Sequence, residues 1–142
     1  RISGGGTVLL GPGCLCYTLF MPTTHPQGHS ISTTNTFIMT QHANALQQLT
    51  KSPVTVKGHT DLCINELKFS GNAQRRTRNH ILFHGTILYN FDLSLISTTL
   101  KHPSKEPDYR KKRTHKDFLS NFPAQKQNII NTISNTWNAK IL

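Results

Sequence analysis

The chain has 142 residues, and its 16 Lys and Arg residues outnumber its 6 Asp and Glu residues, which gives a formal net charge of +10 at pH 7. This length fits a single domain that can bury a core without metal ions or disulfides. No stretch approaches the roughly 18 consecutive apolar residues of a membrane-spanning helix, so we expect no membrane span. The positive charge favours an anionic partner, such as nucleic acid, a membrane surface, a nucleotide or an acidic protein.

The cysteines and the first residues give two further expectations. The three cysteines, Cys14, Cys16 and Cys63, are an odd number, which is not typical of a disulfide framework and favours a reducing compartment, the cytoplasm. The sequence opens without Met, in the glycine-rich segment 1–6, so we expect the natural protein to begin further upstream. A secretory signal is not visible.

The first half of the chain alternates strand-like and helical patterns. Residues 7–10 and 15–20 are apolar runs on either side of the turn at 11–13 and predict two strands. Residues 21–30 predict a loop. Between residues 32 and 49 the apolar positions recur at helical spacing, which predicts a helix.

The second half predicts a run of strands followed by helices. Asn65-Glu66 is a plausible tight turn between two strands, and Asp92 is a candidate N-cap for a short helix that ends near Leu100. A last helix is expected from Pro123 to Ala139. The fold class that follows is α+β, a mixed, largely antiparallel sheet flanked by helices. The expected strands are residues 54–56, 61–64, 67–70, 81–83 and 86–91.

A strongly basic segment, residues 101–116, lies between the last two predicted helices. It contains seven Lys or Arg residues and two His residues around Glu106 and Asp108. We interpret it as a connecting segment within a single domain that covers residues 1–142.

Three segments carry residues suited to binding or catalysis. Arg1-x-Ser3 followed by Gly4, Gly5 and Gly6 offers backbone N–H groups that can approach phosphate or carboxylate oxygens. No Gly-Lys-Ser/Thr follows, and a strand follows where a Rossmann loop needs a helix, so neither of those motifs is present.

The second segment places Lys68 on a predicted strand just before Ser70-Gly71, where a rigidly held ammonium could stabilise developing negative charge. Asp61 on the preceding strand could hold a divalent cation through its oxygens. The third segment is His84-Gly85-Thr86, where the His-Gly pair inside an apolar run predicts a bulge or a close backbone approach.

Taken together and in order, these motifs resemble the biotin/lipoate protein ligase family, and within it the lipoate–protein ligase A branch. The motifs are Arg-x-Ser-Gly-Gly-Gly-x-Val, Asp-Leu, Lys-x-Ser-Gly-x-Ala-Gln-Arg-Arg and His-Gly-Thr-Ile-Leu, and the similarity runs from residue 1 to about residue 122. The chain departs from the family where members usually carry two arginines before the glycines and His-Asp near residue 11.

The resemblance implies a ligase that activates lipoate or octanoate with ATP and Mg²⁺ and transfers the acyl group to a lysine of an acidic lipoyl domain, of the 2-oxoacid dehydrogenase or glycine cleavage type. It implies that Lys68 is the catalytic cation and that Asp61 binds nucleotide, directly or through Mg²⁺. The other substrate- or nucleotide-binding residues that it implies are Arg1, Ser3, Gly4, Gly5, Gly6, Ser70, Gly71, Ala73, His84, Gly85 and Thr86.

Three alternatives stay open. An octanoyltransferase of the same fold would need no ATP but would need a cysteine nucleophile, for which only Cys63 lies nearby, in a shifted register. A zinc site could combine Cys14-x-Cys16 with His25 and His29, although the usual finger spacing differs. A basic nucleic-acid-binding module would use segment 101–116, but it leaves the Lys68 motif unexplained.

Overall fold

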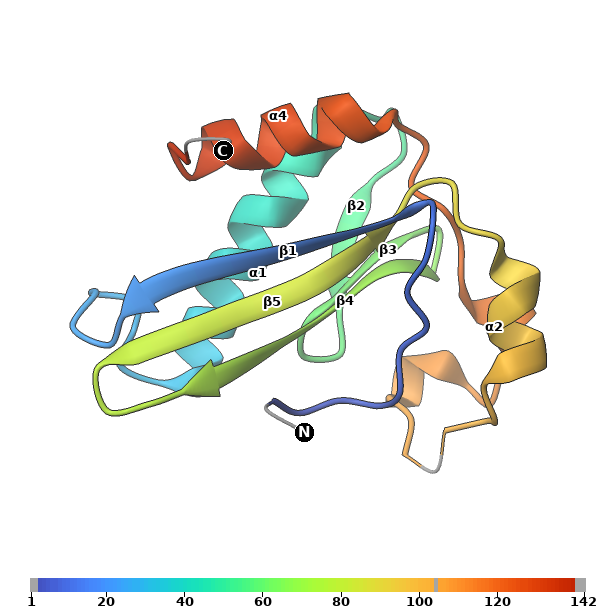
Figure 1. Cartoon of the computed structure of the whole chain (residues 1–142), viewed down its shortest axis with the longest axis horizontal. Helices are drawn as coiled ribbons and strands as arrows, with labels where there is room; N and C mark the ends of the chain where they lie inside the picture. The colour runs from blue at the N-terminus through green and yellow to red at the C-terminus, as the bar shows by residue number, and fades with distance from the viewer. Residues whose placement is uncertain (1–2, 104, 140–142) are drawn as a thin grey trace.

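A computed structural model describes residues 3–103 and 105–139. These residues form one sheet of five antiparallel strands in the order β1-β5-β4-β3-β2, with helices on both sides of it (Figure 1). The predicted α+β class is confirmed. In chain order the elements are β1 (Cys14–Pro22), α1 (Ile31–Gln47), β2 (Val54–Lys57), β3 (Asp61–Ile64), β4 (Leu67–Arg76), β5 (His80–Leu88), α2 (Leu93–Thr99), a 3₁₀ turn (Asp108–Arg110), α3 (His115–Phe118) and α4 (Lys126–Thr136).

Local signals placed several elements correctly. Ser30 caps α1 by accepting a hydrogen bond from the backbone N–H of Thr33, and Asp92 caps α2 in the same way through Ser94. Asn65 and Glu66 have positive φ angles of 49° and 64°, which is the geometry of a two-residue hairpin turn. The predictions of α1, α2 and this turn are confirmed.

Three predictions of secondary structure are wrong. Residues 7–10 form no strand; the side chain of Leu9 packs instead on the small core beneath α2. The predicted strands 81–83 and 86–91 are one strand, β5, with no bulge at His84-Gly85, because both residues stay paired with β1 and β4. Helix α4 begins at Lys126, later than Pro123, because the residues before it are held in another way: the N–H of Phe122 donates to the carbonyl of Leu88 in β5, and that of Ala124 donates to the carbonyl of Phe122.

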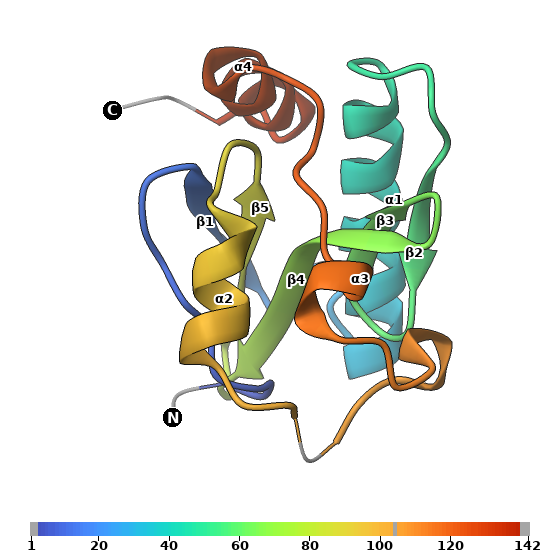
Figure 2. The ribbon, with the colours of Figure 1, turned by 90° about the vertical axis from the view of Figure 1, so that its right-hand side faces the viewer.

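Two hydrophobic cores occupy the two sides of the sheet. The larger one lies between the sheet and the pair α1 and α4 and includes Ile38, Leu46, Phe69, Phe83 and Ile129, none of them exposed. The smaller one lies beneath α2 and α3, which lie next to each other in Figure 2; it is built on Leu88, Phe91 and Ile96. The smaller core covers only part of its face of the sheet, and the rest of that face is not covered by helices α1 and α4.

A series of part-buried hydrogen bonds connects α4 to the sheet through α1. The indole N–H of Trp137 donates to Nε2 of His42 at 2.8 Å, and Nδ1 of His42 lies 3.1 Å from the hydroxyl of Tyr17. Because an indole N–H can only donate, Nε2 must be unprotonated and Nδ1 must carry the proton that is donated to Tyr17. Tyr17 in turn donates to Oδ1 of Asn72. This series is therefore directional and requires neutral His42.

Acid should disrupt this series of hydrogen bonds. Burial lowers the pKa of His42 from 6.5 to about 4, whereas unfolding returns it to its ordinary value. As the pH falls from 6.5 to 4, His42 becomes protonated in the unfolded state but stays neutral in the native state. The free energy of unfolding therefore decreases over this pH range. We expect a loss of about 3 kcal/mol, measured by urea unfolding at several pH values.

A His42→Phe variant is the matched control, because it keeps a ring at this buried position and cannot titrate. It should be less stable at pH 7 but should lack the loss between pH 6.5 and 4. Equal pH slopes for the parent and the variant would refute the assignment of acid lability to His42.

Candidate active site

A bulge in β4 places the motif residues Lys68 and Ser70 on opposite faces of the sheet. Asp61 and Leu62 of β3 pair with Gly71 and Ser70, but the next residue, Cys63, pairs with Lys68, so Phe69 has no partner of its own. Phe69 and Ser70 are therefore both buried, while the side chain of Lys68 lies on the opposite, open face of the sheet. Without the bulge, strict alternation would bury Lys68.

Neighbouring strands then align the predicted residues in adjacent rows on the open face. Gly71 pairs with both Asp61 and Thr86, which gives one row across β3, β4 and β5. Ala73 pairs with His84 in the next row. Residues that are far apart in the sequence thus share one surface, because paired positions in a sheet point to the same side.

Lys68 and Asp61 form the central ion pair of this surface. The Nζ atom of Lys68 lies 2.8 Å from Oδ1 of Asp61, and the side chains are 26% and 15% exposed. The lysine backbone is also held, since the N–H of Ser120 donates to its carbonyl at 3.0 Å. An ammonium has three N–H donors, so Lys68 retains donor capacity beyond the bond to Asp61.

A second contact brings the glycine-rich loop to the same face. The hydroxyl of Ser3 lies 2.6 Å from Nε2 of His84 and shares a hydrogen bond with it. Gly4, Gly5 and Gly6 follow as an exposed loop with open space around each α-carbon, and Gly5 has a φ of 108°. The loop can therefore present backbone N–H groups beside His84. Arg1, which was predicted here too, lies outside the described residues.

Two residues with predicted roles in binding lie on the helix side of the sheet. Ser70 is 1% exposed, and its hydroxyl accepts a hydrogen bond from the amide of Asn72 at 3.1 Å. Gly85 pairs with Asn72 and Tyr17 and faces the same side. Ser70 and Gly85 therefore lie beneath the open face, where they pack in the sheet and do not line its surface.

Two further residues contact this site: Tyr109, which sequence reasoning did not select, and Cys63, which it named only for the acyltransferase alternative. The hydroxyl of Tyr109 donates to Oδ2 of Asp61 at 2.7 Å, and the thiol of Cys63 lies 3.7 Å from the same hydroxyl. Burial raises the pKa of Cys63 to about 11, so its thiol is neutral at pH 7. In the sequence, Tyr109 stands out only as an aromatic residue inside a charged segment. Hydrophobic periodicity gives no indication that this segment contacts β3.

The mutation Gly71→Ala should disturb the ion pair and spare the fold. A Cβ on Gly71 would lie 2.8 Å from Nζ of Lys68 and 2.9 Å from its Cε, so the flexible lysine would move away from Asp61. We expect about a tenfold loss of any activity that depends on the Lys68 ammonium, with a change in melting temperature of only a few degrees.

Gly11→Ala is the control for that variant, because its added Cβ would only reach ordinary contact with Phe91, at 3.4 Å. It should keep the parent rate. Equal rates for Gly71→Ala and the parent would mean that the position of Lys68 does not limit the reaction.

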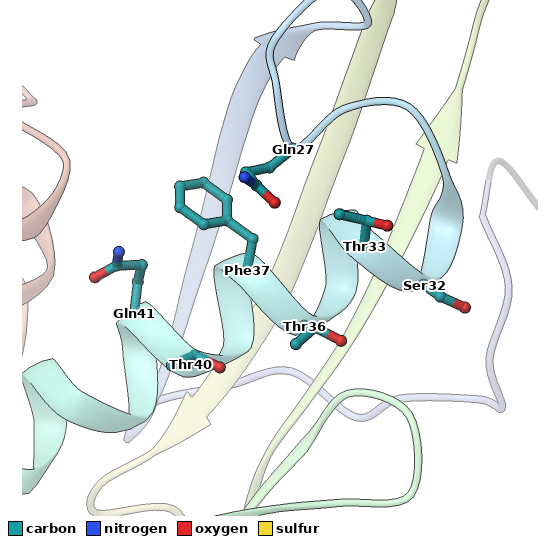
Figure 3. A pocket seen from close by; sticks show the side chains of 7 residues that line it. All are labelled: Gln27, Ser32, Thr33, Thr36, Phe37, Thr40 and Gln41. Carbon is teal, nitrogen blue, oxygen red and sulfur yellow. The ribbon is translucent and has the colours of Figure 1, made fainter.

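Within the described ranges 3–103 and 105–139, no three His, Cys, Asp or Glu residues are grouped so that they could hold a metal ion, and this leaves the predicted zinc alternative without support. In the same ranges no helix is long and apolar enough to cross a membrane. A shallow hollow lies over the first turns of α1, where Figure 3 shows Phe37 beside Gln27 and Gln41, far along the chain from the Lys68 motif.

The sequence of residues 1–129 matches the lipoyl protein ligase A/B catalytic domain. The chain belongs to that family. It is 32% identical over 133 residues to a probable lipoate-protein ligase A of Mycoplasma genitalium, covering 89% of this chain and 38% of that protein. It is 25% identical to the inactive lipoate–protein ligase 2 of Plasmodium falciparum, covering 84% of this chain and 39% of that protein. The chain thus spans about two fifths of the length of these curated relatives.

A solved structure shows the same fold. The bi-partite lipoate protein ligase of Thermoplasma acidophilum, described with its E2 lipoyl domain, superposes with a TM-score of 0.76 at 19% identity, over 100% of this chain and 58% of that one. The family and the fold that the motifs predicted are therefore confirmed, whereas the role of each site residue stays a prediction.

Proposed function

We propose that this chain is catalytic-domain sequence of a lipoate–protein ligase, which uses ATP to activate lipoate or octanoate and passes the acyl group to a lysine of a lipoyl domain. The observation that carries the proposal is the Lys68–Asp61 ion pair on the open sheet face, next to the row that contains the Ser3–His84 contact. Membership of the ligase family supports it.

In the first half-reaction a carboxylate oxygen of the acid attacks the α-phosphorus of ATP. A P–O bond forms, the bond to pyrophosphate breaks, and acyl-AMP results. Negative charge grows on the phosphoryl oxygens, and the ammonium of Lys68, held in place by Asp61, is positioned to stabilise it. The loop of Gly4, Gly5 and Gly6 would contribute N–H donors to the same anion.

In the second half-reaction the amine of the acceptor lysine attacks the acyl carbonyl. The acceptor is an ammonium at neutral pH, with a free pKa near ~10.4, so it first gives one proton to solvent. The neutral amine then forms the C–N bond, the C–O bond to AMP breaks, and a second proton passes to solvent as the amide forms. Charge now develops on the carbonyl oxygen, so the same Lys68 ammonium would serve both steps. Ser3 and His84 would border the acyl group on the glycine side.

Magnesium fits this site as a companion of the nucleotide. Asp61 is the carboxylate on this face whose oxygens accept bonds from Lys68 and Tyr109 and retain further lone pairs. A single carboxylate together with substrate phosphates and water is a usual environment for Mg²⁺. Asp61 would therefore hold Mg²⁺ that arrives with ATP, and the ion would neutralise phosphate charge.

The acceptor that fits the charge of this chain is an acidic lipoyl domain in the cytoplasm. Segment 101–116 exposes positively charged side chains next to Tyr109, which contacts the site. Opposite charges on two partners raise their rate of encounter. The exposed lysines are Lys101, Lys105, Lys111, Lys112 and Lys116.

Intact-mass measurement on an apo lipoyl domain tests the proposal. The full-length protein is incubated with the domain, lipoate and Mg²⁺, with and without ATP, and a domain with its acceptor lysine changed to arginine is the control. A mass gain of one lipoyl group that requires both ATP and the lysine is expected. A gain without ATP from octanoyl carrier protein would identify an acyltransferase instead, although the neutral, buried Cys63 thiol disfavours that chemistry. No gain with either donor would refute both.

A further inference from the structure

Part of the basic segment 101–116, from residue 105 onward, folds against the site together with Phe118, which follows it. Tyr109 lies in the 3₁₀ turn Asp108–Arg110, and its ring packs on that of Phe118 with the centroids 5.4 Å apart. From there its hydroxyl reaches Oδ2 of Asp61, at 2.7 Å, on the other side of the ion pair with Lys68. A residue from the charged segment is therefore one hydrogen bond away from the central carboxylate.

Two arginines hold Tyr109 in this position. The guanidinium of Arg110 lies 4.7 Å from the centroid of Phe118 and is 5% exposed, and that of Arg113 lies 5.2 Å from the same ring. Arg113 also donates to the backbone carbonyls of Tyr109 and of Glu66, in the β3–β4 turn. Such charge-assisted and cation–π contacts favour one orientation of the segment.

The direction of the hydrogen bond is determined by chemistry. A carboxylate can only accept, so the phenol of Tyr109 is the donor. Burial and the charge of Asp61 raise the pKa of Tyr109 well above its usual range, and the phenol therefore keeps its proton at neutral pH. The same phenol accepts from the thiol of Cys63 at 3.7 Å, so both of its functions are used.

We propose that Tyr109 is a positioning residue of the active site, which holds the carboxylate of Asp61 so that its other oxygen faces Lys68; this inference rests on the proposed ligase function. A carboxylate rotates easily about its last torsion. Asp61 is only 15% exposed, so water has little access to replace a lost partner. Bonds at opposite oxygens fix the plane of the carboxylate, and with it the direction in which the Lys68 ammonium points.

The variant Tyr109→Phe tests this inference in the full-length protein. It keeps the ring on Phe118 and removes only the hydroxyl. We expect kcat for acyl-adenylate formation to fall about tenfold with a small change in KM, because a hydrogen bond to a charged group is lost while substrate contacts remain. Tyr89→Phe, a part-buried tyrosine packed on the larger core, is the control and should keep the parent kcat.

A second readout does not depend on activity. An amine-reactive acylating reagent is applied, and the labelling rate of each lysine is followed by peptide mass spectrometry. In Tyr109→Phe the Lys68 rate should rise several-fold, since the ion pair that protects its ammonium is loosened. Lys57, which pairs with Glu66 at 2.8 Å, should be labelled at the parent rate and serves as the internal reference.

Combination with Asp61→Ala separates positioning from a general effect on folding. In that background Asp61 can no longer transmit the change, so adding Tyr109→Phe should alter neither the rate nor the labelling of Lys68. Full retention of the Tyr109→Phe effect there, or parent values for kcat and Lys68 labelling in the single variant, would overturn the inference. If the parent protein forms no adenylate at all, the proposed function fails, and the labelling result still decides the role of Tyr109.

Discussion

Replacing Lys68 with Ala is expected to lower the rate of acyl-adenylate formation by about 10²–10³-fold, the usual cost of losing one fixed donor at a site of developing charge. Lys68 is positioned twice, by Asp61 at its ammonium and by Ser120 at its carbonyl. The side chain is part-exposed on the open face, so its removal leaves no cavity in either core. The measurement is the rate of acyl-AMP formation, with the circular dichroism spectrum and the melting temperature as tests of folding.

Lys57→Ala is the matched control for this variant. Lys57 lies opposite Asp61 in the β2–β3 pair, but its ammonium forms an ion pair of the same length, 2.8 Å, with Glu66 in the β3–β4 turn. The control should keep the parent rate. Adenylate formation at the parent rate by a folded Lys68→Ala protein would remove Lys68 from the mechanism.

Most of the fold could be predicted from the sequence because several of its elements are determined by local interactions. The caps at Ser30 and Asp92 and the turn at Asn65-Glu66 are local, because each depends on hydrogen bonds or φ angles within a few residues. The same is true of the apolar stripe of α1. Leu9 was misread because a run of apolar residues does not distinguish a strand from an extended segment that packs on a separate helix, α2.

The candidate site was harder to predict because it depends on register. Alternation along β4 would have placed Lys68 and Ser70 on the same face, and only the bulge at Phe69 puts them on opposite faces. A bulge in one strand is set by its partner strand, which a single sequence does not reveal. Tyr109 is harder still, since 48 residues separate it from Asp61 and its ring is held by Phe118, which two arginines also contact.

Gly85→Ala should strongly destabilise the sheet. A Cβ there would lie 2.6 Å from Cγ of Asn72 and would collide with its Oδ1. Asn72 cannot move freely, because its amide donates to the carbonyl of Thr60 at 2.7 Å and its oxygen accepts from Tyr17. Overpacking together with the loss of buried hydrogen bonds should cost about 3 kcal/mol. Urea unfolding at pH 7 measures this loss directly.

The partner of the collision can be identified with a second substitution. Asn72→Ala removes the side chain that the new methyl group meets, so Gly85→Ala should cost little more in that background, and the two changes should be strongly non-additive. Gly6→Ala is the stability control, because open space surrounds the α-carbon of Gly6 and no positive φ is required there. Additive losses would mean that the methyl group at residue 85 is rejected by the strand backbone, where the carbonyl of Gly71 lies 3.0 Å away. A sub-additive result would instead show that Gly85, the glycine of the His-Gly motif, packs against Asn72 and so against the Trp137–His42–Tyr17–Asn72 hydrogen bonds. It would explain why residue 85, beneath the open face of the sheet, has no side chain.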